Sequence, residues 1–277
     1  MDLEKIKIVE LDILRTIIDI LNRHSITYFI SYGTCIGAIR HHGFIPWDDD
    51  IDIALYRHDY EKARLILSQE LPSQYLYVDN RINPIYPYNF GKVRKKNTAF
   101  VHGGDAHLDI HHGIYVDIFP LDNCPDSLEE TKQLMRKIRR LRRCVDLSSM
   151  SFFKYNKIRP IWQIPLIAFA KLFINRHNYQ KHIDDMCVSN NNSNSKEVCC
   201  FLTPYYEKDI YPREWFGKGT KTTFENLEVT IPEKYDLYLK HIYGNYMQLP
   251  PINKQISHHD VIYSNLDGEY HPNNDFV

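Results

Sequence analysis

The chain has 277 residues and a formal net charge of -1, with 43% apolar and 25% charged residues. That length suits one large or two small domains, and the near-zero charge leaves nucleic-acid or membrane binding only to a local patch. The six cysteines form no CxxC pair, and the first 24 residues indicate a charged amphipathic helix and no secretory signal, so we expect reduced thiols in a cytoplasmic protein.

The first half of the chain alternates between helical and strand patterns. Helices are predicted over residues 3–23, 34–42 and 59–71, and strands over 27–33, 51–56, 75–79, 88–94 and 114–119. This order favours an α/β fold, a mixed sheet with flanking helices. We assign residues 1–126 to a catalytic core.

From about residue 127 the pattern becomes mainly helical, and we expect residues 127–277 to cover the donor and the acceptor, with the last residues as a tail or lid. Residues 132–143 contain seven Lys or Arg and no acid, and the apolar run 160–174 follows. That run is too short to span a bilayer. The region 128–174 therefore predicts either a buried helix beside a solvated one, or peripheral contact with the inner face of the cell membrane.

An acidic cluster precedes the predicted strand 51–56, in the segment "GFIPWDDDIDIALY" (43–56). On a strand, Asp50 and Asp52 point to the same side, about 7 Å apart at their Cα atoms. Two carboxylates 4 Å apart repel by about 4 kcal/mol at an effective dielectric of 20. Either one of them is protonated or a divalent cation lies between them, and adjacent acids favour the cation. A solvated acidic turn is the alternative.

Two further features accompany this cluster. Asp117 lies inside the apolar strand "GIYVDIFPLD" (113–122), where a carboxylate is costly without a strong partner. Gly33 and Thr34 lie between a predicted strand and a predicted helix, whose N-terminal N–H groups can hold phosphate. Three carboxylates from two strands beside a glycine turn are typical of metal-dependent phosphoryl transfer.

The segment "SYGTCIGAIRHHGFIPWDDDIDIALYRHDYEK" (31–62) resembles the signature of the LicD family of phosphotransferases. The resemblance continues in "GKVRKKNTAF" (91–100), "GIYVDIFPLD" and "YLKHIYGNYMQLPP" (238–251), followed by Ser257, His258 and His259, and it is loose over 127–220. It implies a nucleotidyltransferase-like fold. It also implies transfer of a phospho-alcohol, typically phosphocholine from CDP-choline, to a sugar hydroxyl of a lipopolysaccharide, teichoic acid or capsule, with CMP leaving.

The resemblance also implies the roles of the site residues. Asp50, Asp52 and Asp117 would hold Mg²⁺ or Mn²⁺, with Asp48 and Asp49 as further ligands or candidate bases. Gly33 and Thr34 would cradle the donor phosphates.

Basic residues near the turn suit the same chemistry. Arg40 could meet the pyrophosphate, and Lys92 and Arg94, which alternate along a strand, could bind phosphate; each could equally be a surface residue. Either Asp117 or Asp49 could accept the proton of the acceptor hydroxyl. The histidine-rich segment 102–112 is interpreted as a mobile loop over the site, with a zinc site as the alternative.

Several functions remain open. The donor could be CDP-glycerol or CDP-ribitol, and the acceptor a glycan or a lipid-linked oligosaccharide; no nucleic-acid partner is expected. The alternatives are a nucleotidyltransferase, a glycosyltransferase with an Asp-x-Asp motif, and a non-catalytic binding protein.

Overall fold

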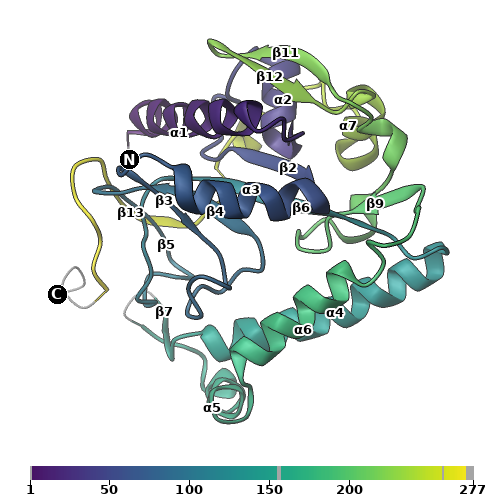
Figure 1. Cartoon of the computed structure of the whole chain (residues 1–277). Helices are drawn as coiled ribbons and strands as arrows, with labels where there is room; N and C mark the ends of the chain where they lie inside the picture. Colours follow the sequence, from purple (N-terminus) through teal and green to yellow (C-terminus); the bar gives the residue numbers. More distant parts are fainter. Residues whose placement is uncertain (1, 155–156, 258, 273–277) are drawn as a thin grey trace.

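The computed structural model describes residues 2–154, 157–257 and 259–272 (Figure 1). Within these residues seven strands form a mixed sheet in the order β1-β2-β6-β4-β3, with β9 paired to the end of β6 and β10 paired to β9. This confirms the predicted α/β fold. The strands are β1 (Phe29–Ile30), β2 (Asp52–Tyr56), β3 (Tyr75–Val78), β4 (Gly91–Lys95), β6 (Tyr115–Asn123), β9 (Glu197–Cys199) and β10 (Ile210–Pro212).

Strand β6 lies at the centre of this sheet. It pairs in parallel with β2 and antiparallel with β4 and β9, and all nine of its residues are buried. Its β-branched and aromatic residues suit a strand that is covered on both faces. Helix α3 (Arg57–Glu70) follows β2 and is tied to β6 by the Arg57 guanidinium, which binds Asp122 through two hydrogen bonds of 2.7 and 2.8 Å.

Helices α1 (Leu3–Arg23) and α3 pack on the sheet and against each other. Helix α1 has the predicted bounds. Its side chains Ile6, Ile13 and Ile17 recur at helical spacing and are buried, as expected for an amphipathic helix that covers a sheet.

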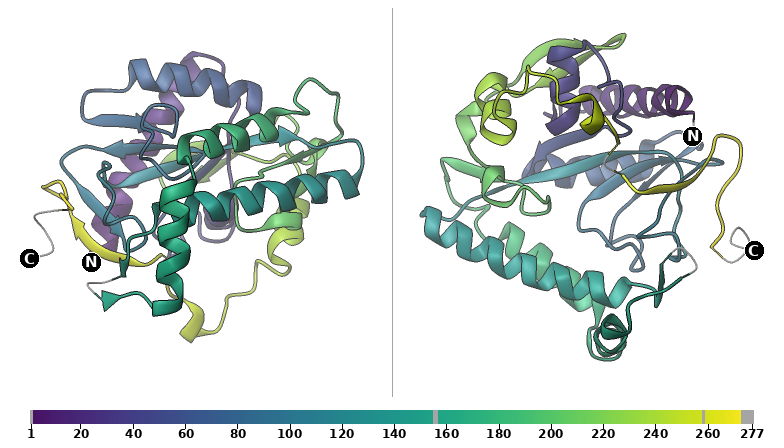
Figure 2. Two further views of the ribbon diagram at one scale, coloured as in Figure 1. Left: turned by 90° about the horizontal axis from the view of Figure 1, so that it is seen from below. Right: turned by 180° about the vertical axis from the view of Figure 1, so that it is seen from behind.

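Helices α4 (Leu128–Ser149), α5 (Ile164–Phe173) and α6 (Arg176–Val188) form a separate group. Figures 1 and 2 show α4 and α6 side by side below the sheet, with α5 at the lower edge, and α4 contacts both of the others. Helix α6 is joined to the loop before β4, because Asn89 Nδ2 donates to Asp184 Oδ1 at 2.8 Å. A short hairpin of β7 (Phe153–Lys154) and β8 (Lys157–Ile158) precedes α5.

The turn after β1 differs from its prediction. Helix α2 (Tyr32–Arg40) begins at Tyr32, and β1 is only two residues long. The Tyr32 N–H donates to the hydroxyl of Tyr238, at 3.1 Å, in α7 (Tyr235–Tyr243). Because α2 begins at Tyr32, Gly33 and Thr34 lie in its first turn. Strands β11 (Thr220–Phe224) and β12 (Leu227–Ile231) form an antiparallel hairpin.

The C-terminal segment contains a strand where we expected a tail or lid. Strand β13 (Val261–Asn265) pairs antiparallel with β5 (Ala99–His102), with Val261 opposite His102. The strand contains Val261, Ile262 and Tyr263, residue types that favour strands, among polar neighbours, and the pairing with β5 provides the hydrogen bonds that order it. Because of this pairing, Asp260, which directly precedes β13, accepts the backbone N–H of Gly103 at 2.9 Å through its carbonyl oxygen.

Candidate functional site

Three charged side chains lie in a row across neighbouring strands. Asp52 of β2 is in register with Asp117 of β6, and Asp117 is in register with Lys92 of β4. Residues in register point to the same face of a sheet, with their strands about 4.8 Å apart. The Nζ atom of Lys92 lies 2.6 Å from Oδ1 of Asp117. The register therefore brings together one acid of the predicted cluster, the embedded acid and a predicted phosphate-binding lysine.

The other acids lie in the loop that leads into β2, beside the first turn of α2. A Cβ atom on Gly33 would lie 2.8 Å from Oδ2 of Asp48, so the absence of a side chain at position 33 permits this close approach. The hydroxyl of Thr34 accepts the backbone N–H of Asp52 at 2.9 Å. Gly33 is thus in close contact with Asp48, and Thr34 is hydrogen-bonded to Asp52, so the first turn of α2 contacts the acidic segment at two points.

His259 completes this group from the far end of the chain. Its Nδ1 atom lies 2.9 Å from Oδ1 of Asp49, and its Nε2 atom lies 3.6 Å from Oδ2 of Asp50. One ligand atom from each of these three residues lies within 4.8 Å of the others, an arrangement that can hold a metal ion. The sequence pattern pointed to this histidine but to no partner for it. Its neighbour His258 lies outside the described residues.

Burial and mutual repulsion disfavour the charged forms of these acids. Burial, then the charges of Asp50 and Asp49, raise the pKa of Asp48 to about 7. Burial raises the pKa of Asp50 to about 6, although the charge of His259 opposes this. Asp52 is shifted well upward, by burial first and then by Asp50 and Asp117. Burial alone would lower the pKa of His259, but the hydrogen bond to Asp49 and the charge of Asp50 raise it to about 9.

The donor set fits a divalent cation. Oδ2 of Asp49 is buried and has no hydrogen-bond partner within the described part of the chain, and the buried Oδ1 of Asp117 is paired with Lys92 Nζ at 2.6 Å. Buried carboxylate oxygens without donors are costly, and a hard divalent cation binds such oxygens preferentially. A cation here would relieve both the repulsion and the missing contacts. Because ligands must lose their protons, such a cation would also compete with the proton on His259.

Lys92 and Arg94 share a face of β4, as their alternation predicts. Lys92 Nζ lies 3.4 Å from the ring centroid of Tyr115, and the Arg94 guanidinium lies 5.1 Å from it. The Tyr115 hydroxyl is 2.9 Å from Nε2 of His102, whose ring contacts that of His259. Lys92 is paired with Asp117 and so belongs to the row of charged side chains. Arg94 instead donates to the Gly113 carbonyl at 2.9 Å.

Arg40 lies at the other end of α2 from Gly33 and Thr34. Its guanidinium donates to the backbone carbonyl of Tyr246 and contacts His41. In this arrangement Arg40 joins α2 to the segment after α7. Its predicted contact with the donor pyrophosphate stays a prediction.

Glu10 of α1 was missed by the sequence reasoning. It is fully buried, and neither carboxylate oxygen has a hydrogen-bond partner within the described residues. Burial, and then the charges of Asp50, Asp49 and Asp48, raise its pKa well above the usual range. A signal was present in the sequence, because Glu10 stands on the apolar stripe of α1 between Ile6 and Ile13, where an acid is out of place.

The histidines of segment 102–112 have separate partners. His107 contacts the Ser149 carbonyl at 2.6 Å, His112 contacts the Leu108 carbonyl at 3.0 Å, and His111 lies 3.4 Å from Glu269. Because the rings point to different groups, this arrangement does not favour the zinc alternative. His102 is the member of this segment that contacts the acidic site, through His259.

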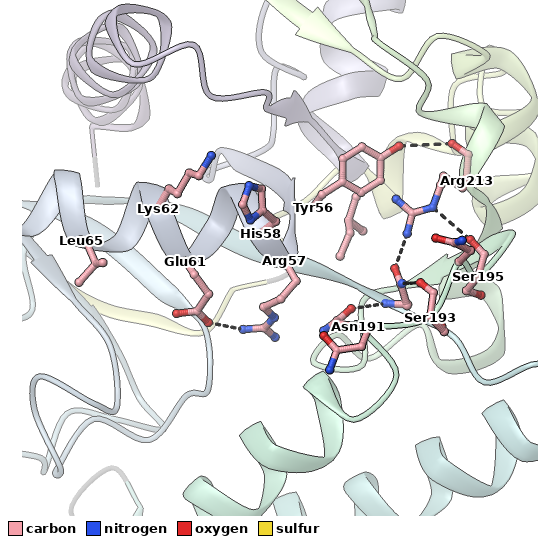
Figure 3. Close-up of a pocket in the computed structure, with 14 residues that line it drawn as sticks. Tyr56, Arg57, His58, Glu61, Lys62, Leu65, Asn191, Ser193, Ser195 and Arg213 are labelled. Atoms are coloured by element: carbon pink, nitrogen blue, oxygen red, sulfur yellow. Dashed lines mark hydrogen bonds and ion pairs between the residues drawn. The ribbon is translucent and has the colours of Figure 1, made fainter.

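A pocket of about 760 Å³ lies away from these acids, at the C-terminal ends of β2 and β6 (Figure 3). Tyr56, the loop around Asn191 and the side chain of Arg213 line it, and the Arg213 guanidinium stands 4.8 Å from the Tyr56 ring centroid. The acids of the candidate site do not line this pocket, so its size is no argument for placing the reaction there.

Comparisons with known proteins identify the family of the chain. Residues 25–170 match the family model described as LicD/FKTN/FKRP, nucleotidyltransferase domain. The chain is 26% identical over 247 residues to the lipopolysaccharide cholinephosphotransferase LicD of Haemophilus influenzae, covering 86% of this chain and 88% of the relative. It is 28% identical over 122 residues to the human ribitol 5-phosphate transferase FKRP, covering 35% of this chain and 24% of the relative.

The acidic segment and Asp117 both fall inside the matched region.

None of the helices that the structure describes combines the length and the hydropathy that a membrane crossing requires.

Proposed function

The chain belongs to the LicD/FKTN/FKRP family, and on that premise we propose that it transfers a phospho-alcohol, phosphocholine from CDP-choline in the first instance, to a sugar hydroxyl of a cell-surface glycan. The observation that carries the proposal is the row of Asp52, Asp117 and Lys92 beside Asp49, Asp50 and His259. The cholinephosphotransferase name of the Haemophilus relative, which aligns over most of both chains, supports the choice of alcohol.

The proposed reaction makes one phosphodiester bond and breaks one phosphoanhydride bond. The oxygen of the sugar hydroxyl attacks the phosphorus that carries the alcohol, and the bridging oxygen leaves with CMP. Asp49 or Asp117 takes the hydroxyl proton. Oδ2 of Asp49 is buried without a hydrogen-bond partner in the described structure and is available to receive it, whereas Oδ1 of Asp117 is paired with Lys92.

We propose Mg²⁺ or Mn²⁺ as the cofactor, held by Asp50, Asp52 and Asp117 with Asp48 as a further ligand. Bound there, the cation would stabilise the negative charge that develops on the phosphoryl oxygens. His259 would hold Asp49 and Asp50 in place, or add a nitrogen ligand once its proton is lost. The protein would thus contribute mainly alignment and charge.

The donor phosphates would lie between the first turn of α2 and β4. The N–H groups of Gly33 and Thr34 are at a helix N-terminus, where anions are stabilised. Lys92 faces the same row of acids and brings a positive charge to it. Arg94 and Arg40 are proposed as supporting cations. Arg94 stands on the same face of β4 as Lys92, while Arg40 would have to leave the Tyr246 carbonyl.

A second donor class has support of its own. The human relative is named for ribitol 5-phosphate transfer, so CDP-ribitol, and by the same chemistry CDP-glycerol, are alternative donors. We propose that the enzyme works in the cytoplasm on a glycan or a lipid-linked oligosaccharide. All six cysteines, which lie within the described ranges, are free thiols, as a reducing compartment requires.

The test is a donor panel with the purified full chain. CDP-choline, CDP-glycerol, CDP-ribitol and a UDP-sugar are each supplied with Mg²⁺ and a lipopolysaccharide or teichoic-acid acceptor, and released CMP or UDP is measured. CMP release with one CDP-alcohol, together with the mass of that phospho-alcohol added to the acceptor, is expected. Addition of CMP to the acceptor would instead indicate a nucleotidyltransferase, and UDP release a glycosyltransferase.

A further inference from the structure

Helix α5 and the 3-10 helix η1 (Ile161–Gln163), which directly precedes it, expose large apolar side chains that no other part of the described chain covers. Ile161, Trp162, Leu166, Phe169, Leu172 and Phe173, which we call the α5 apolar surface, are between 51% and 86% exposed. Residues 162, 166, 169 and 173 follow helical spacing along one side, whereas Ile167 and Ala170 are buried on the other. The exposed side is thus a continuous stripe, larger than the scattered apolar residues of an ordinary surface.

The surroundings of this surface are strongly basic. Residues 131–183 contain thirteen Lys or Arg and one acid, Asp146, in a chain whose net charge is -1. Lys137, Arg140 and Arg143 of α4 are exposed, and so is Lys171 within α5 itself. A local positive patch of this kind can bind an anionic surface even though the whole chain carries almost no net charge.

Helix α5 also lies where a flat partner can reach it. It is at the lower edge of the molecule, beneath α4 and α6 (Figure 1). Its ten residues are about 15 Å long by the rise of an α-helix, half of what a spanning segment needs. A helix of this length, apolar on one side and flanked by cations, instead suits the boundary between headgroups and acyl chains.

We propose that the α5 apolar surface and the basic face of α4 dock the protein on an anionic lipid bilayer. The apolar side chains insert at the headgroup boundary, and the lysines and arginines bind lipid phosphates. A protein partner would also cover apolar side chains. However, residues 131–183 contain thirteen cationic side chains and one acid, which favours a partner surface of dense negative charge. The proposal is independent of the transfer reaction.

Vesicle sedimentation with the full chain tests this. Phosphatidylcholine vesicles containing 30% phosphatidylglycerol should bind the protein at least tenfold better than phosphatidylcholine alone, with binding weakened by salt. Trp162 emission should shift to shorter wavelength on binding, and Trp162→Phe should lose that shift. The double variant Phe169→Asp/Leu172→Asp should lose at least tenfold in partitioning, whereas Ile252→Asp, at a residue 82% exposed outside this surface, should bind as the parent does.

Two results would overturn the proposal. If the protein stays in the supernatant with both vesicle types, no bilayer contact exists. If light scattering shows a dimer that Phe169→Asp/Leu172→Asp dissociates, without vesicle binding by the parent, the surface is an interface between copies. CMP release measured on the same variants with a soluble acceptor keeps a failure here separate from a failure of the proposed activity.

Discussion

The Nδ1 atom of His259 lies 2.9 Å from Oδ1 of Asp49, although the two residues are 210 positions apart in the chain. The pairing of β13 with β5 begins two residues after His259 and holds it there. We predict that His259→Gln lowers the rate of CMP release by about 10- to 100-fold, because it removes the positive charge and the ring nitrogens beside Asp49 and Asp50, as loss of a residue that orients metal ligands does. His58→Gln, at an exposed position on α3, is the matched control and should retain the parent rate. Parental activity in His259→Gln would remove this residue from the site.

Asp50→Asn tests the acidic cluster itself. The substitution removes one charge with little change of shape, so we expect CMP release to fall by orders of magnitude, about 100-fold or more, while the melting temperature stays near that of the parent. Calorimetric titration with Mn²⁺ should show weaker metal binding. Asp185→Asn, an exposed acid on α6 paired with Lys181, is the control. An unchanged rate with Asp50→Asn would exclude the assigned metal site.

Gly33→Ala tests the contact between the turn and Asp48. The added Cβ would lie 2.8 Å from Oδ2 of Asp48, so the carboxylate must move, and a displacement of this size in a preorganised site costs about 100-fold in rate. Gly104→Ala is a matched control, since a Cβ there meets nothing within 4 Å. Equal CMP release by the two variants would show that the position of Asp48 does not matter for catalysis.

The buried ion pair between α3 and β6 makes a prediction about stability. Asp122 is fully buried. It accepts two hydrogen bonds from Arg57 and a third from Asn191 at 2.7 Å. Asp122→Ala leaves the buried Arg57 cation with the partly exposed Glu61, at 3.1 Å, in place of its buried partner. We expect about 3–5 kcal/mol less unfolding free energy in urea titrations. Asp185→Ala breaks an exposed pair instead and should cost at most about 1 kcal/mol. Similar losses in both variants would contradict the assignment.

Asp209 makes a prediction about pH. Burial raises its pKa to about 7, although the hydroxyls of Tyr211 and Tyr32 donate to it. The ordinary pKa of an aspartate is about 3.9, so between about pH 4 and 7 the unfolded chain releases a proton that the folded chain retains. The contribution of Asp209 therefore favours folding below pH 4 and is lost as pH rises through 7.

Asp209→Asn cannot titrate, so its unfolding free energy should decline less between pH 5 and pH 8 than that of the parent. Urea midpoints measured at several pH values give this difference directly. Parallel curves for the two proteins would mean that Asp209 ionises normally in the folded state.

The sequence by itself determined the α/β class, the bounds of α1, the acidic segment and the family. These features are local: apolar residues at a spacing of 3.6 or 2 report a helix or a strand, and a dense acidic run beside a glycine turn stands out without knowledge of its neighbours. The sequence also placed Asp117 in a strand, from the pattern of Ile, Tyr, Val and Phe around it, and indicated that an acid there requires a strong partner.

Only the tertiary structure decided which residues meet. The register of β2, β6 and β4 aligns Asp52, Asp117 and Lys92, and a shift by one residue would turn each side chain to the other face. The strand β13 that brings His259 to Asp49 forms by pairing with β5, and Glu10 is isolated from water only because α1 packs on the sheet. Such contacts depend on packing between distant segments, which local periodicity does not encode.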